Sequence, residues 1–132
     1  MKQKYLLSEI TNINLDLKPG DIVFLNWDLA SWKTTLSKHI INDLLWIEWD
    51  VTSPTYTYYN KYGENIYHFD LYRLSNYDEF FAIWWEDILD DENNIVLIEW
   101  PDIIKKYYSP TIEINLFKTQ NLDEREIEII KK

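Results

Sequence analysis

The stretch formed by residues 22–45 constrains the fold of this chain more than any other. It begins with four consecutive apolar residues at 22–25, passes through a polar loop, and ends in a helical pattern over residues 33–45. A short run that is apolar throughout predicts a central parallel strand, because such a strand is buried on both faces. Apolar residues then mark one face of the helix: Leu36, Ile40, Ile41, Leu44 and Leu45. The succession of strand, tight loop and helix is the layout of a phosphate-binding loop.

The loop itself predicts a nucleotide site. Its residues are Trp27, Asp28, Leu29, Ala30, Ser31, Trp32, Lys33, Thr34 and Thr35. In the pattern G-x-x-x-x-G-K-[ST], backbone N–H groups and the helix N-terminus hold phosphate oxygens, the lysine reaches the terminal phosphates, and the hydroxyl binds Mg²⁺. Lys33 and Thr34 fill the last two places, whereas Trp27 and Trp32 stand where the pattern needs glycine. A plain strand–helix corner with an exposed Lys33 is the alternative.

The scarcity of glycine bears on those two positions. The chain has 2 glycines and 7 tryptophans in 132 residues, whereas average usage of about 7% predicts roughly nine glycines. Six tryptophans fall in the loop or near predicted helix ends, where glycine is favoured: Trp27, Trp32, Trp46, Trp49, Trp84 and Trp85. We hypothesise that these six are glycines written as tryptophan, through a reassigned UGA codon or through mutagenesis. Trp100 is excluded from the set, and an ordinary tryptophan-rich protein is the alternative.

Two further strand-like runs end in acidic residues. Residues 66–69 lead to Asp70, and the wholly apolar residues 95–98 lead to Glu99. Ligands of α/β sheets bind outside the carboxyl ends of the strands, and an acid beside the phosphate loop typically orients Mg²⁺ or water. With Thr34, these two carboxylates predict a Mg²⁺ site of hard oxygen ligands. Each acid alone is more typical of a helix cap or an exposed strand end, and His68 is expected to be a packed strand residue.

The elements together predict a single α/β domain over residues 1–132, with helices on both faces of a mixed, mainly parallel central sheet. Alternation of Ile13, Leu15 and Leu17 with polar residues favours an edge strand. Further strands are expected at residues 5–7, 55–59, 66–69, 111–117 and 126–130, the last two forming a hairpin at the end of the sheet. A short helical turn is expected around Ile88 and Leu89.

Composition narrows the possible function. The absence of cysteine excludes disulfides and thiol catalysis. A net charge of −10 argues against a direct grip on a nucleic-acid backbone and favours a protein partner or a metal-neutralised anion. No apolar run is long enough to span a bilayer, and the first residues lack the apolar core of a signal peptide. We therefore expect a cytoplasmic protein.

Four stretches, in order and spacing, resemble the TsaE family of small P-loop ATPases. They are the loop from Trp27 to Thr35, similar to the family's G-D-L-G-A-G-K-T-T; Ser53-Pro54-Thr55-Tyr56; His68-Phe69-Asp70-Leu71-Tyr72-Arg73; and Ile98-Glu99-Trp100-Pro101. The likeness covers nearly the whole chain. It departs from the family at Trp27, Trp32 and Ala30, which stand in place of glycines.

The resemblance implies a P-loop NTPase-like three-layer fold and an Mg²⁺-dependent ATPase. Such an ATPase would support threonylcarbamoyladenosine (t6A) modification of tRNA together with the TsaB and TsaD proteins, meeting tRNA only indirectly. It implies ATP and Mg²⁺ as ligands, with Lys33 on phosphate, Thr34 and Glu99 on the metal, and Asp70 and Glu99 in the hydrolysis site. Ser53 and Thr55 would lie on a switch-like loop. The alternatives are a non-catalytic docking subunit with an inactive loop and an unrelated P-loop kinase or transporter ATPase.

Overall fold

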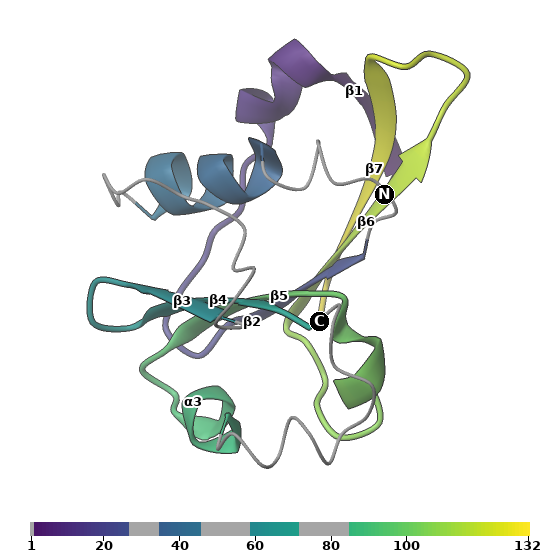
Figure 1. The fold of residues 1–132 in the computed structure, drawn as a ribbon. Coiled ribbons are helices and arrows are strands. Elements are labelled where there is room, and N and C mark those ends of the chain that lie inside the picture. Colours follow the sequence, from purple (N-terminus) through teal and green to yellow (C-terminus); the bar gives the residue numbers. More distant parts are fainter. Residues whose placement is uncertain (1, 27–34, 46–58, 72–84) are drawn as a thin grey trace.

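A mixed sheet runs through the part of the chain that the computed structural model describes, residues 2–26, 35–45, 59–71 and 85–132 (Figure 1). Within these residues the sheet has seven strands in the order β1-β7-β6-β2-β5-β4-β3. The three central pairs, β6–β2, β2–β5 and β5–β4, are parallel, and the outer pairs are antiparallel. The strands are β1 Lys2–Leu6, β2 Ile22–Asn26, β3 Tyr59–Tyr62, β4 Ile66–Asp70, β5 Ile95–Glu99, β6 Ile112–Lys118 and β7 Glu124–Lys131.

Helical segments cover both faces of this sheet. The 3₁₀ helix η1 (Leu7–Asn12) and the π-helix η2 (His39–Leu44), which continues from α-helical residues 35–38, lie on one side in Figure 1. The helix α3 (Glu86–Asp90) and the 3₁₀ helix η3 (Pro101–Ile104) lie on the other side. One hydrophobic cluster fills each interface. The predicted α/β class, with helices on both faces of a sheet that is parallel at its centre, is confirmed.

The two wholly apolar runs form the centre of the sheet, as predicted. In β2, Val23, Phe24 and Leu25 are buried, and β5 is buried along its whole length. The two strands are parallel neighbours, with Leu25 opposite Glu99. The predicted helix after the loop is also present in the described residues, where Leu36, Ile40 and Ile41 are buried against the sheet. The residues of the predicted phosphate loop from 27 to 34 lie outside the described part of the chain.

The predicted edge strand at Ile13, Leu15 and Leu17 is wrong, because residues 13–18 form no strand. Ile13 and Leu15 are nevertheless buried in the cluster beneath η2, and Leu17 packs against that cluster. The alternation therefore reflects a segment that lies across the core without pairing to a strand. The edge of the sheet is instead β1, which pairs with β7.

The remaining strand predictions are confirmed in type but shifted in place. The strands β6 and β7 pair antiparallel, yet β7 is not terminal, because β1 lies outside it. The hairpin partner of β4 is β3, described over Tyr59–Tyr62; residues 55–58 of the predicted strand lie outside the described range. The helical turn around Ile88 and Leu89 is α3.

Trp85 is a core residue. Its side chain is 3% exposed and packs edge-on against Phe69, with ring centroids 4.7 Å apart, and against Tyr59 at 5.9 Å. Its φ of −76° is an ordinary right-handed value. Position 85 therefore does not require glycine. Trp85 was grouped with the five other tryptophans because glycine is favoured near helix ends, and that reason does not apply to its backbone.

This packing gives a stability prediction. Replacing Trp85→Ala should lower the free energy of unfolding by about 3–5 kcal/mol, because the change removes buried aromatic surface and leaves a cavity. Urea denaturation followed by circular dichroism measures the effect. Leu122→Ala is the control, because Leu122 is 86% exposed and its loss should cost less than about 0.5 kcal/mol. Equal losses in the two variants would contradict a core role for Trp85.

Candidate active site

Two predicted site residues, Asp70 and Glu99, lie at the carboxyl ends of neighbouring parallel strands. Asp70 ends β4 and Glu99 ends β5, and the two residues are opposite one another in the register. The backbone N–H of Leu71 donates to the carbonyl oxygen of Glu99 at 3.1 Å, which fixes the two strand ends together. Because β2 is the next strand along from β5, both acids lie close in the sheet to the strand that leads into the predicted phosphate loop.

Glu99 is buried and is contacted from two other elements. Its exposed fraction is 1%. The hydroxyl of Ser37, on the helix that follows the predicted loop, donates to Glu99 Oε1 at 3.2 Å. Nε2 of His68, on β4, lies 3.3 Å from the same oxygen. A buried carboxylate costs free energy unless polar groups surround it. Ser37 supplies a hydrogen bond to Oε1, and His68 places a polar ring nitrogen close to the same oxygen.

The pleat of the sheet explains why these groups meet. Residues two apart on a strand point to the same face, and His68 is opposite Leu97 just as Asp70 is opposite Glu99. Leu97 belongs to the cluster beneath η2, so the side chains of His68, Asp70 and Glu99 share the face covered by the helix of Ser37. The expectation that His68 is a packed strand residue is confirmed, because its exposed fraction is 1%.

Sequence reasoning missed the contact of Ser37 and of His68 with Glu99. A signal was present for both residues. Ser37 follows Thr34 by three residues, the spacing that brings two side chains to one face of a helix. His68 precedes Asp70 by two residues on the same strand. Neither spacing is specific by itself, since many buried serines and histidines share it.

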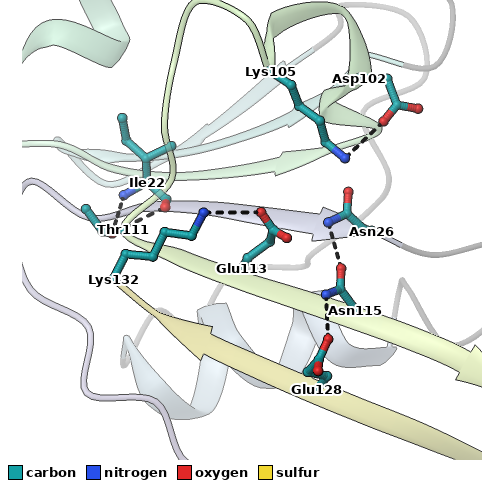
Figure 2. Close-up of polar contacts among 9 residues, drawn as sticks. All are labelled: Ile22, Asn26, Asp102, Lys105, Thr111, Glu113, Asn115, Glu128 and Lys132. Carbon is teal, nitrogen blue, oxygen red and sulfur yellow. Dashed lines mark hydrogen bonds and ion pairs between the residues drawn. The ribbon is translucent and has the colours of Figure 1, made fainter. Parts of the chain in front are cut away.

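A chain of amides fixes the end of β2, immediately before residue 27 (Figure 2). Asn26 Nδ2 donates to Asn115 Oδ1 at 2.8 Å, and Asn115 Nδ2 donates to Glu128 Oε1 at 3.1 Å. An ionised carboxylate only accepts hydrogen bonds, so Glu128 sets the direction of both amides. The bonds tie β2 to β6 and β7 at the point where the predicted loop begins.

The turn after Glu99 has an unusual backbone. Trp100 has φ = 57° and ψ = 57°, and it is the one non-glycine residue with positive φ in the described part of the chain. Left-handed geometry costs a residue with a side chain about 1–2 kcal/mol. Such strain tends to occur at functional sites. Pro101 follows at the start of η3, so β5 ends at the acid and a short helix begins two residues later.

Of the other predicted site residues, the structure describes only Thr35. Thr35 is half-buried and begins the described part of the helix. Ser53 and Thr55, like Trp27, Asp28, Leu29, Ala30, Ser31, Trp32, Lys33 and Thr34, lie outside the described residues, and their roles stay predictions. No helix in the described ranges is long and apolar enough to cross a membrane.

The donor set at the strand ends fits Mg²⁺ as far as it is described. Within the described residues, no group of three or more histidines or acids is placed to hold a metal ion. Asp70 and Glu99 supply two carboxylates, and Mg²⁺ in nucleotide sites is held by one or two carboxylates together with phosphate oxygens and waters. The two acids therefore suit a metal that a nucleotide shares, and they do not form an all-protein metal cage.

The sheet has parallel central strands, and a helix from residue 35 follows the central strand β2 in the chain. Together with the acids at the ends of β4 and β5, this arrangement fits a P-loop NTPase-like fold. A solved structure of this type, Bacillus subtilis YdiB, superposes with a TM-score of 0.61 at 25% identity and covers 96% of this chain and 82% of its own. The family model described as threonylcarbamoyl adenosine biosynthesis protein TsaE matches residues 3–127. The chain belongs to the TsaE family.

Individual relatives agree with this assignment. A Rickettsia typhi protein is 39% identical over 105 residues, which cover 76% of this chain and 72% of the relative. A Bacillus subtilis protein is 32% identical over 113 residues, with 83% and 69% covered, and one from Haemophilus influenzae is 38% identical over 93 residues, with 68% and 58% covered. Each of the three is named tRNA threonylcarbamoyladenosine biosynthesis protein TsaE.

Proposed function

We propose that this chain is an Mg²⁺-dependent ATPase that supports t6A modification of tRNA together with the TsaB and TsaD proteins. The observation that carries the proposal is the register of Glu99 on β5, the parallel neighbour of β2, with Asp70 on β4, the next strand beyond it. The strand β2 ends at Asn26, directly before the predicted Lys33-Thr34 loop in the sequence. Family membership adds the pathway, since the relatives are named for threonylcarbamoyladenosine biosynthesis. A role in tRNA modification would place the protein in the cytoplasm.

Each site residue has a role in this proposal. Lys33 would contact the terminal phosphates, and the loop from Trp27 to Thr35 would surround them with backbone N–H groups. Thr34 and Glu99 would hold Mg²⁺, which when bound neutralises charge on the phosphate oxygens. The carboxylates of Asp70 and Glu99 would orient the attacking water. Ser53 and Thr55 would lie on a segment that responds to the nucleotide.

The charge of the chain favours protein partners over direct tRNA contact. A net charge of −10 repels a phosphate backbone, and binding of nucleic acid normally uses clusters of lysine and arginine. Contact with tRNA would therefore pass through TsaB and TsaD.

The test is phosphate release from ATP by the purified chain, with and without TsaB and TsaD, in the presence of Mg²⁺ or EDTA. The assay is run on the chain itself and on its Trp27→Gly/Trp32→Gly variant, which restores the loop pattern. We expect hydrolysis that requires Mg²⁺ and that rises when the partners are added. Absence of hydrolysis in both versions, together with retained partner binding, would instead establish the non-catalytic docking subunit.

A further inference from the structure

Glu99 is held by two side chains to which the proposed function assigns no task. Ser37 Oγ donates to Glu99 Oε1 at 3.2 Å, and His68 Nε2 lies 3.3 Å from the same atom. Ser37, His68 and Glu99 are each 1% exposed. The three residues come from the helix after the predicted loop, from β4 and from β5. Three separate elements therefore converge on one carboxylate oxygen.

We propose that Ser37 and His68 are positioning residues that set the orientation of the Glu99 carboxylate relative to the phosphate loop. This inference rests on the proposed function. Ser37 follows Thr34 by three residues in the sequence, and its hydroxyl ties the acid to the helix whose described part begins at Thr35. Both groups contact Oε1, and they therefore restrict rotation of the carboxylate about its last carbon–carbon bond.

The burial of His68 supports this role. Neither ring nitrogen of His68 has a hydrogen bond of good geometry within the described residues, and Nε2 approaches Glu99 Oε1 without one. A buried polar group in that state destabilises the fold. An apolar side chain of similar size would pack on β4 without that cost. An imidazole here is therefore explained by what it does to Glu99 and not by packing.

Four variants, each made in the Trp27→Gly/Trp32→Gly chain that restores the loop pattern, separate a positioning role from a packing role. Ser37→Ala and His68→Phe remove the polar atom that contacts Glu99, whereas Ser37→Thr and His68→Gln keep one near its place. We expect kcat for ATP to fall at least about tenfold in the first two, with KM changed less than about threefold, because a misplaced catalytic group affects turnover more than binding. Ser37→Thr and His68→Gln should retain at least about a third of kcat. Unchanged turnover in the first pair, or equal loss in both pairs, would overturn the proposal.

His39→Phe is the matched control for loss of a buried imidazole. His39 is 5% exposed and lies in the same helical segment as Ser37, but its Nε2 contacts the carbonyl oxygen of Ile13 at 2.7 Å. We expect this variant to lose stability, with kcat kept within about threefold. A loss of kcat equal to that of His68→Phe would show that any buried histidine has the effect, and would overturn the specific role.

A second measurement needs no ATP. Urea denaturation of Ser37→Ala, Glu99→Ala and the double variant forms a double-mutant cycle, because each single substitution removes one partner of the contact. We expect the midpoint shift of the double variant to differ from the sum of the single shifts. Additive shifts would overturn the Ser37–Glu99 contact. If the unmodified chain and its glycine-restored variant both fail to hydrolyse ATP, the proposed function fails, while the cycle still decides the contact.

Discussion

Glu99→Gln should abolish most ATP hydrolysis while leaving the fold intact. The substitution keeps the size of the side chain and its Oε1 acceptor, so the hydroxyl of Ser37 can still donate to it. It removes the negative charge that would hold Mg²⁺ and orient water. Loss of a group of this kind typically lowers turnover by about 100- to 1,000-fold. The substitution is made in the Trp27→Gly/Trp32→Gly chain, which is expected to bind ATP, and steady-state phosphate release at saturating ATP and Mg²⁺ measures its kcat.

A control variant must show that losing one negative charge elsewhere in the chain does not lower kcat. Glu113→Gln is the control, because Glu113 is a half-buried carboxylate on β6, a strand that β2 separates from β5, and its Oε1 lies 3.9 Å from Nζ of Lys132 (Figure 2). Made in the same Trp27→Gly/Trp32→Gly chain, this variant should keep kcat within about twofold of that parent. If Glu99→Gln retained more than about a tenth of the original kcat, the assignment of Glu99 to the hydrolysis site would be wrong.

The centre of the fold was predictable because burial on two faces leaves a clear pattern. Residues 22–25 and 95–98 are apolar throughout, and each is a central parallel strand. The acids that end the strands could be predicted for the same reason, since ligands bind at that edge of the sheet. Such a pattern depends only on local residue types and on the period of the strand.

Features that depend on pairing partners were not predictable in the same way. Ile13 and Leu15 alternate as a strand does, yet they reach the core from an unpaired segment. The short strand β1 takes the edge because it pairs with β7, more than a hundred residues away in sequence. The convergence of Ser37 and His68 on Glu99 likewise follows from the relative placement of three elements, which no local period specifies.

Trp85 differs from the two loop tryptophans, Trp27 and Trp32, in whether its position calls for glycine. Its right-handed backbone and buried ring need no glycine, and Trp85→Gly should therefore destabilise the fold. By contrast, the loop pattern requires glycine at positions 27 and 32. The codons offer a direct check: UGG at both positions would exclude the reassigned UGA codon as the source of these two tryptophans.

Replacing Trp27 and Trp32 by glycine should raise the affinity for Mg²⁺-ATP at least about hundredfold. In the left-handed geometry that the loop pattern assigns to glycine, each residue with a side chain costs about 1–2 kcal/mol. An indole in the space that phosphates need costs about 1–3 kcal/mol more, by analogy with overpacked cores. Since about 1.4 kcal/mol corresponds to tenfold in affinity, the two sites together exceed a hundredfold change.

Calorimetric titration measures the affinity for Mg²⁺-ATP directly. It compares the unmodified chain, the double variant and a variant in which all six tryptophans are replaced by glycine. We expect very weak binding to the unmodified chain and Mg²⁺-dependent binding to the double variant. The six-fold variant should bind ATP as the double variant does where it is folded, but unfold at lower urea concentration, because it also lacks the core ring of Trp85. Equal ATP affinities of the unmodified chain and the double variant would show that tryptophan at these positions leaves the loop competent, and that the glycine pattern is not needed in this chain.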